Sequence, residues 1–137
     1  MIIGYTTGVF DLFHVGHVNL LRNASSLCDR LIVGVTSDEL VSYKNKKSVI
    51  PYDERIEIVR ACSYVDLAVP QLNMNKVEAL ERYKFNILFV GDDWFKNDKW
   101  KKYEDDLKQK GVNIIYFPYT KSTSSTLINE TLKNLRN

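Results

Sequence analysis

The sequence has few of the residues that mark secreted, metal-binding and membrane proteins. Its two cysteines, Cys28 and Cys62, lie in or at the end of helical patterns among apolar neighbours, without metal-ligand spacing. We therefore expect reduced thiols packed as small hydrophobic groups in a cytoplasmic protein. No apolar run approaches the length of a membrane span, and the N-terminal segment lacks the basic stretch and apolar core of a signal peptide.

Net charge is also small. Nineteen basic against 17 acidic residues leave +2, too little to predict nucleic-acid or membrane binding from bulk electrostatics. The hydrophobic share of 45% is ordinary for a soluble globular protein, and 137 residues suit one continuous core. Since we find no repeat, low-complexity segment or linker, we expect residues 1–137 to form a single domain.

Short apolar runs alternate with helical patterns along the whole chain. This alternation predicts an α/β fold, a Rossmann-like doubly wound parallel sheet of five strands with helices on both faces. We expect Pro51 at the first position of a helix, and Gly111 at the end of another. The expected strands are residues 2–7, 30–36, 66–70, 86–90 and 112–117. One expected helix follows residues 8–17 and ends at about residue 27, and the others cover 37–41, 51–62, 75–84, 98–110 and 125–135.

Polar segments follow four of these strands. In doubly wound sheets the ligand lies beyond the carboxyl ends of the strands, where the strand order reverses. The polar segments are residues 8–17, 36–47, 91–94 and 119–126. We therefore expect the four segments to converge on one crevice that holds a single active site.

The only two histidines, His14 and His17, lie where the first strand passes into a helix. Their i, i+3 spacing predicts that they share one helix face, and Gly16 between them lets a ligand approach the backbone and the free amides of the helix start. Imidazole N–H groups there would stabilise charge on reacting phosphates. The alternatives are packed or surface histidines, or a zinc site, which would need a third protein ligand that the sequence does not supply.

The other polar segments allow two interpretations each. Lys44, Lys46 and Lys47 form either a solvated charge run or a loop that closes over a triphosphate and a phosphorylated acceptor. The hydroxyls of residues 120–126 form either a second phosphate cradle or a helix N-cap. Asp11, Asp92 and Asp93 bind a base, a ribose or a metal, or cap the segments that follow them.

Residues 8–17, read as GVFDLFHVGH, resemble the G-x-F-D-x-x-H-x-G-H signature of the cytidylyltransferase family within the HxGH nucleotidyltransferase superfamily. The resemblance is greatest to glycerol-3-phosphate cytidylyltransferases. It extends over nearly the whole chain, through residues 44–47, 52–55, 64–66, 90–94 and 124–126.

This resemblance implies transfer of a cytidylyl group from CTP to a small phosphorylated alcohol, with glycerol 3-phosphate as the first candidate and CDP-glycerol as its product. The acceptor phosphate attacks the α-phosphate directly and pyrophosphate is released. Mg²⁺ is held mainly through the CTP phosphates. The family also implies a homodimer, and a role in making teichoic-acid-type cell-surface polymers.

The resemblance assigns roles to individual residues, with no metal-ligating side chain among them. The catalytic residues are His14, His17, Lys44 and Lys46. Those that bind the acceptor are Lys44, Asp11 and Lys76. Those that bind the nucleotide are Val9, Phe10, His14, Val15, Gly16, His17, Lys46, Asp92, Asp93, Tyr119, Thr120, Lys121, Ser122, Thr123, Ser124, Ser125 and Thr126.

The chain departs from the family pattern around both substrates. Tyr119 replaces an arginine that usually meets the nucleotide, and Ser63 and Met74 replace an arginine and a tryptophan near the acceptor. The alternatives are therefore another phosphorylated acceptor, ATP in place of CTP, or a non-catalytic nucleotide-binding module.

Overall fold

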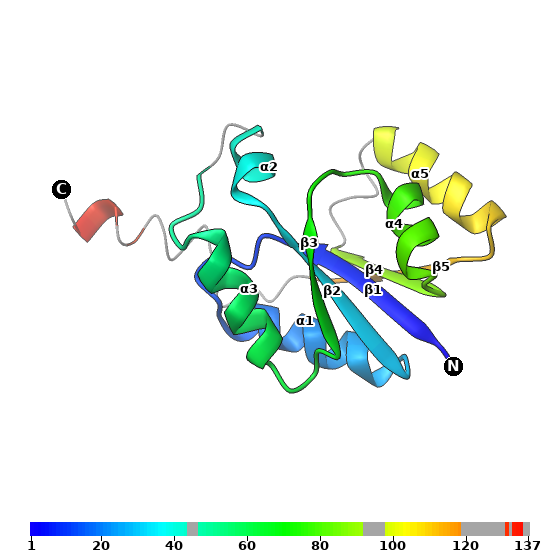
Figure 1. Ribbon diagram of the computed structural model, residues 1–137, viewed down its shortest axis with the longest axis horizontal. Helices are drawn as coiled ribbons and strands as arrows, with labels where there is room; N and C mark the ends of the chain where they lie inside the picture. Colours follow the sequence, from blue (N-terminus) through cyan, green and yellow to red (C-terminus); the bar gives the residue numbers. More distant parts are fainter. Residues whose placement is uncertain (44–46, 92–97, 119–130, 132, 136–137) are drawn as a thin grey trace.

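The computed structural model describes residues 1–43, 47–91, 98–118, 131 and 133–135, and Figure 1 shows their arrangement. The strands are β1 (Ile3–Gly8), β2 (Arg30–Thr36), β3 (Leu67–Gln71), β4 (Ile87–Gly91) and β5 (Asn113–Phe117). The helices are α1 (Val15–Ser26), α2 (Asp38–Tyr43), α3 (Tyr52–Ala61), α4 (Lys76–Tyr83) and α5 (Asp98–Gln109). Each of these elements overlaps one that the sequence pattern predicts.

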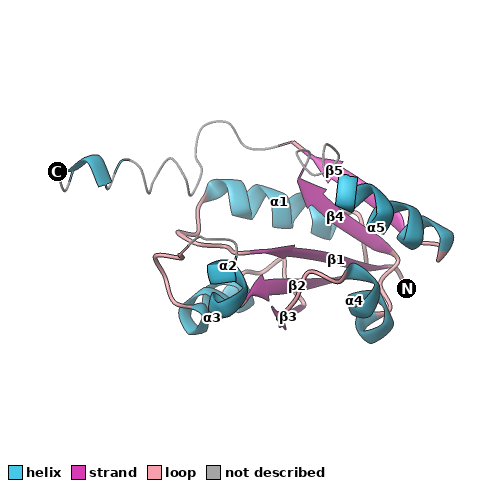
Figure 2. Ribbon diagram, turned by 90° about the horizontal axis from the view of Figure 1, so that it is seen from above, coloured by secondary structure: helices cyan, strands magenta, loops and turns pink. Residues whose placement is uncertain are grey.

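All five strands pair in parallel, in the order β3-β2-β1-β4-β5 (Figure 2). The predicted Rossmann-like sheet is confirmed. Because the chain moves outward from β1 to β3 and then returns to the other side of β1, the strand order reverses between β1 and β4. The carboxyl end of β1 is therefore the place at which a ligand is expected.

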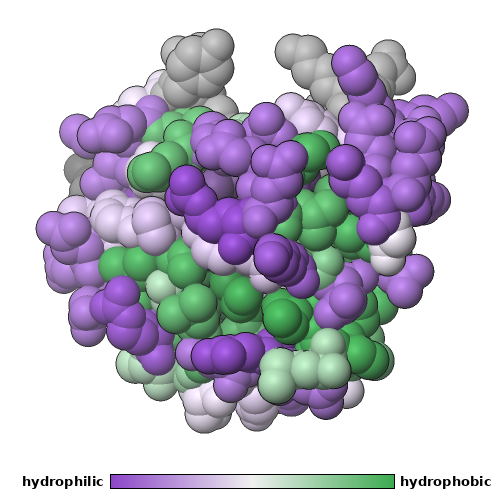
Figure 3. Space-filling model, turned by 45° about the vertical axis from the view of Figure 1, so that its right-hand side comes forward, coloured by the Kyte–Doolittle hydropathy of each residue, from purple (hydrophilic) through white to green (hydrophobic). Residues whose placement is uncertain are grey.

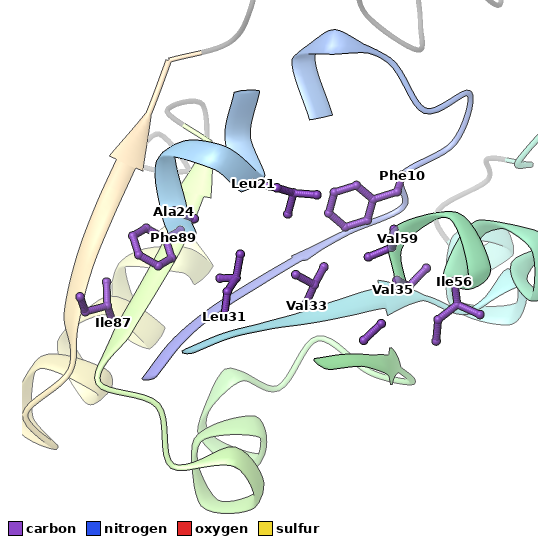
Figure 4. Close-up of a cluster of buried hydrophobic side chains, with 11 residues drawn as sticks. Phe10, Leu21, Ala24, Leu31, Val33, Val35, Ile56, Val59, Ile87 and Phe89 are labelled. Carbon is purple, nitrogen blue, oxygen red and sulfur yellow. The ribbon is translucent and has the colours of Figure 1, made fainter. Parts of the chain in front are cut away.

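Helices cover both faces of the sheet, with α1 and α3 on one side and α4 and α5 on the other (Figure 1). Leu21 of α1 and Val59 of α3 are fully buried in the first core cluster, where they pack on β2 residues such as Val33 (Figure 4). Leu107 of α5 is fully buried in the second cluster, against Leu88 of β4. The strands have apolar residues on both faces because both faces are covered.

The helix ends follow backbone rules, with one correction to the prediction. Pro51 is the N-cap of α3 in extended conformation and not its first helical residue, and Asp53 and Glu54 occupy the first turn as expected. Gly111 ends α5 as predicted: its φ is +86°, its N–H donates to Lys108, and the next N–H, of Val112, donates to Leu107 at 3.0 Å. This pair of bonds is the usual glycine-terminated helix end.

Hydrophilic side chains cover the upper part of the face in Figure 3, and hydrophobic ones lie exposed among them farther down.

Both cysteines are free and half-buried, as expected. None of the helices in the described part of the chain has the length and apolar character needed to cross a bilayer.

Candidate active site

The site begins with a constrained turn between β1 and α1. Phe10 and Leu12 have φ values of +55° and +49°, in the left-handed region that side chains other than glycine rarely adopt. Phe10 is nevertheless only 3% exposed, and a Cβ on Gly8 would lie 3.0 Å from its ring. A side chain at Gly8 would therefore crowd the Phe10 ring, which folds back over the end of β1.

His14 is the N-cap of α1. Its Nδ1 accepts the N–H of Gly16 at 3.0 Å, and the Nδ1 of His17 in turn accepts the N–H of His14 at 3.2 Å. The two histidines thus form a reciprocal capping box, which in most helices is made by Ser or Thr with Glu or Gln. The His14 and His17 rings, which the sequence places on one helix face, stack with their centroids 4.0 Å apart. The Gly16 amide is taken by the cap, and anion binding by the other amides of the helix start stays a prediction.

The cap fixes which ring nitrogen carries the proton. A neutral imidazole has one donor and one acceptor nitrogen, and both Nδ1 atoms accept here, so both Nε2 atoms carry hydrogen. Burial lowers the pKa of His14, and it lowers the pKa of His17 to about 4, with the neighbouring His14 as the next cause. Both rings are therefore neutral at pH 7 and each has one Nε2–H donor outside the cap.

Aromatic neighbours hold the His17 ring in place. Phe13 stacks on it at 5.2 Å between centroids, and Phe10 meets it edge-on at 5.3 Å. A ring fixed on both sides by packing and through Nδ1 by a hydrogen bond has little freedom left. Such a preorganised donor loses little entropy when it binds an anion.

A buried arginine, Arg55 of α3, connects the segments around this turn. Its side chain is completely buried and its guanidinium donates four hydrogen bonds. The acceptors are the backbone oxygens of Val9 (2.7 Å), Thr36 (2.8 Å) and Ile50 (2.9 Å) and the Asp38 carboxylate (2.6 Å). The sequence pattern predicted no role for Arg55, although residues 52–55 belong to the resemblance, because charge patterning on α3 does not reveal which face is buried.

Asp11, in the turn between β1 and α1, holds the segment that precedes α3. It is 8% exposed, and its two carboxylate oxygens accept the N–H groups of Val49 (2.7 Å) and Ile50 (2.9 Å). Asp38 helps from α2, where its carboxylate also accepts Tyr52 N–H, which is the main reason that its pKa is lowered. Asp11 therefore positions the segment after residues 44–47, and its predicted contact with the acceptor stays a prediction.

Lys76, the other described residue predicted to bind the acceptor, begins α4 and is 5% exposed. Its Nζ donates to Thr7 Oγ1 at 2.7 Å, so the ammonium group lies beside the carboxyl end of β1. At the neighbouring strand ends, Thr36 Oγ1 donates to Gln71 Oε1 at 2.7 Å, and the Gln71 amide faces Met74 Sδ at 3.6 Å. The strand ends β1 to β3 therefore present hydroxyl, amide, thioether and ammonium groups on one side of the sheet.

Most of the remaining predicted site residues lie outside the described residues. They are Lys44, Lys46, Asp92, Asp93, Tyr119, Thr120, Lys121, Ser122, Thr123, Ser124, Ser125 and Thr126. Within the described ranges, no group of three or more His, Cys, Asp or Glu could hold a metal ion. The expectation that Mg²⁺ is held mainly through the CTP phosphates stays a prediction.

Comparison with known proteins identifies the family. A profile described as cytidylyltransferase-like matches residues 5–131. The chain belongs to the cytidylyltransferase-like family. It is therefore a nucleotidyltransferase with a Rossmann-like fold.

Two similar members of this family are glycerol-3-phosphate cytidylyltransferases. The protein of Bacillus spizizenii is 34% identical over 131 residues, which is 95% of this chain and 96% of the relative. That of Staphylococcus aureus is 33% identical over 128 residues, covering 93% and 92%. An FAD synthase of Thermococcus kodakarensis is 34% identical over 116 residues, covering 82% of this chain and 76% of the relative. The relatives therefore share nucleotidyltransferase chemistry but differ in product.

A solved structure supports the fold of this nucleotidyltransferase. The crystal structure of a lipopolysaccharide core biosynthesis protein from Thermoplasma volcanium matches with a TM-score of 0.74 at 24% identity, covering 90% of this chain and 99% of that one. The chain thus has the same sheet and helix arrangement despite the low sequence identity.

Proposed function

We propose that this nucleotidyltransferase transfers a cytidylyl group from CTP to a small phosphorylated alcohol, with glycerol 3-phosphate as the first candidate and CDP-glycerol as its product. An oxygen of the acceptor phosphate forms a bond to the α-phosphorus of CTP. The bond from that phosphorus to the oxygen bridging to the β-phosphate breaks, and pyrophosphate leaves with the electron pair.

The observation that carries this proposal is the pair of neutral Nε2–H donors on His14 and His17. Both imidazoles are fixed by the helix cap and lie at the carboxyl end of β1. In phosphoryl transfer the protein acts mostly by positioning and by stabilising charge on phosphate oxygens. Two uncharged donors on stacked rings suit that task, since no proton has to be transferred for them to act.

The remaining parts of the proposal come from the family. Lys46 contacts the triphosphate and Lys44 the acceptor phosphate, while the backbone at 9–10 and residues 119–126 hold the nucleotide. Mg²⁺ held through the triphosphate would supply positive charge to offset the charge of the leaving pyrophosphate. We further propose a cytoplasmic homodimer that supplies a teichoic-acid-type polymer, as the family resemblance implies.

The nearest alternative keeps the chemistry and changes the substrates. An FAD synthase among the relatives has a product that contains an adenylyl group, which favours testing ATP. The experiment measures pyrophosphate release with CTP, ATP, GTP or UTP, Mg²⁺ and a panel of phosphorylated alcohols and sugars. We expect release with CTP only; turnover with ATP and none with CTP would overturn the choice of nucleotide.

The alternative from another class is a non-catalytic nucleotide-binding module. Calorimetry with CTP, run beside the pyrophosphate assay, distinguishes the two. Binding of CTP without pyrophosphate release from any acceptor in the panel would favour the binding module. Release that depends on His14 and His17 would favour the enzyme.

A further inference from the structure

The turn between β1 and α1 contains two residues other than glycine in the left-handed region. Phe10 and Leu12 have φ values of +55° and +49°. A residue with a side chain stays in this region only where its surroundings hold it there, and such positions gather at functional sites. The groups that hold this turn are therefore candidates for a role in the reaction.

Hydrogen bonds hold the chain on both sides of Phe10. The carbonyl of Val9, the preceding residue, accepts from the Arg55 guanidinium at 2.7 Å. The carboxylate of Asp11, the following residue, accepts the N–H of Ile50 at 2.9 Å, and the Ile50 carbonyl accepts from Arg55 Nε at 2.9 Å. Arg55 therefore holds the carbonyl before Phe10 directly and the carboxylate after it through Ile50.

Arg55 can hold the turn because its own position is fixed. Its side chain is fully buried, and it also donates to the Thr36 carbonyl at 2.8 Å and to the Asp38 carboxylate at 2.6 Å. Thr36 ends β2, which pairs with β1. A guanidinium is planar and its donors point in fixed directions, so the acceptors that it joins keep a fixed spacing. The turn is thus tied to the end of the neighbouring strand.

The Phe10 side chain carries this constraint to His17. Phe10 is 3% exposed and packs in the first core cluster with Leu21 of α1 (Figure 4). Its ring meets the His17 ring edge-on, with 5.3 Å between the centroids. The direction of a side chain depends on the backbone dihedrals of its residue. A turn that relaxed out of the left-handed region would therefore carry the Phe10 ring away from His17.

We propose that Arg55 is a positioning residue for the reaction: it holds Phe10 in its left-handed conformation and thereby fixes the direction of the His17 Nε2–H. This inference rests on the proposed function for the reaction that the imidazole serves. Because its side chain is fully buried, Arg55 acts through the turn and not by contact with a substrate. A misplaced donor weakens the stabilisation of the transition state, so kcat should respond more than KM.

The first measurement concerns His17 itself and needs no substrate. In Arg55→Lys the side chain keeps its charge and can donate to part of the acceptor set, but it lacks the planar fork. We expect the pKa of His17, followed by NMR of its imidazole, to rise from about 4 towards its ordinary value, because a loosened turn admits water to the ring. Arg60→Lys, the same change at an exposed position of α3, should leave this pKa unchanged.

The second measurement is turnover with CTP, a phosphorylated acceptor and Mg²⁺. Displacement of a reacting group by about 1 Å can cost about 10²-fold in rate. Phe13 still stacks on the His17 ring at 5.2 Å in the variant, so we expect a smaller loss of about tenfold in kcat for Arg55→Lys. The KM for CTP should change less than kcat, and Arg60→Lys should keep both values.

A double-mutant cycle tests the route through Phe10. Phe10→Leu removes the edge contact with His17 and leaves the bond from Arg55 to the backbone of Val9. Arg55→Lys should lower kcat by a several-fold smaller factor in the Phe10→Leu protein than in wild type, since residues that act through one contact are not additive. Equal factors in the two backgrounds would overturn the inference, as would an unchanged pKa of His17 in Arg55→Lys.

Asp38→Ala covers the case in which Arg55→Lys does not fold. It removes one partner of the guanidinium at a side chain that is 51% exposed, so it should raise the pKa of His17 and lower kcat by a few-fold. No change in either quantity would then overturn the inference.

Failure of this inference and failure of the proposed function give different results. A protein that releases no pyrophosphate, but in which the pKa of His17 responds to Arg55→Lys, would contradict the proposed function and support the placement of His17 by Arg55. An active protein in which that pKa does not respond would contradict this inference alone.

Discussion

The Nδ1 atom of His17 accepts the backbone N–H of His14 at 3.2 Å, while the two rings stack with centroids 4.0 Å apart. Each histidine therefore does structural work through Nδ1 and offers chemistry through Nε2. Alanine substitution removes both contributions together, so a loss of activity in an alanine variant does not distinguish them.

The variant His14→Asn separates the two roles. The Asn side-chain oxygen can take the place of Nδ1 as acceptor for Gly16 N–H, and Asn is a favourable N-cap, but it has no group at the Nε2 position. We expect unfolding free energy within about 0.5 kcal/mol of wild type and turnover lower by about 10²–10³-fold. Denaturant unfolding and pyrophosphate release measure the two effects.

The comparison variant is His14→Ala, which loses the cap as well and should be destabilised by about 1 kcal/mol. Wild-type turnover in a folded His14→Asn protein would contradict the proposed donor role of Nε2.

The half-buried ring of His17 makes stability depend on pH. Its pKa is lowered from 6.5 to about 4 by burial, so between these values the unfolded chain binds a proton that the folded chain does not. Stability therefore falls as pH drops from 6.5 towards 4, by about 3 kcal/mol from this group alone. Urea unfolding at pH 7 and pH 4.5 measures the loss.

Other groups titrate over the same range, and His17→Gln provides the reference. The variant has no titrating ring, so its stability should fall less than that of wild type over the same pH interval. Parallel pH profiles of the two proteins would be inconsistent with a half-buried His17 that stays neutral in the folded protein.

Arg55 should be the more important of two arginines on α3. Arg55→Met leaves three backbone carbonyls and Asp38 without their donor, and we expect a loss of about 3 kcal/mol or more of unfolding free energy. Arg60, exposed and paired with Glu57 at 2.7 Å, is the matched control. Arg60→Met should cost less than about 1 kcal/mol, since exposed ion pairs contribute little. Equal effects of the two changes would contradict the buried role of Arg55.

The elements that the sequence predicts well are those with a strong local pattern. Apolar runs predicted each strand, and Gly111 ended α5 as expected because a positive φ is a local requirement. Pro51 was misplaced by one residue, because the fixed φ of proline suits both the N-cap and the first helical position. Helix ends are defined by hydrogen bonds over a few residues, which a single proline does not determine.

The candidate site is only partly predictable for a different reason. The position of His14 and His17 follows from a short motif, but their mutual hydrogen bond depends on ring orientation. The bonds of Arg55 to Val9 and Thr36 join residues 46 and 19 positions away in the chain, so no local pattern contains them. The packing of the Tyr5 ring over Gly34 likewise joins residues of two neighbouring strands.

Asp11 should control the order of the segment at 49–50. In Asp11→Asn one side-chain oxygen still accepts an N–H, but the amide nitrogen faces the second backbone N–H, so one of the two bonds is lost and two donors meet. We expect faster hydrogen exchange at Val49 or Ile50, by about tenfold or more, and a loss of about 1–3 kcal/mol in stability. Amide exchange followed by NMR reports both sites separately.

Asp29→Asn is the control, because Asp29 accepts the N–H of Ile2 in an exposed position where water can replace it. Unchanged protection at both amides in Asp11→Asn would mean that the loop is held by other contacts, and Asp11 would then be left for the acceptor role that the family resemblance implies.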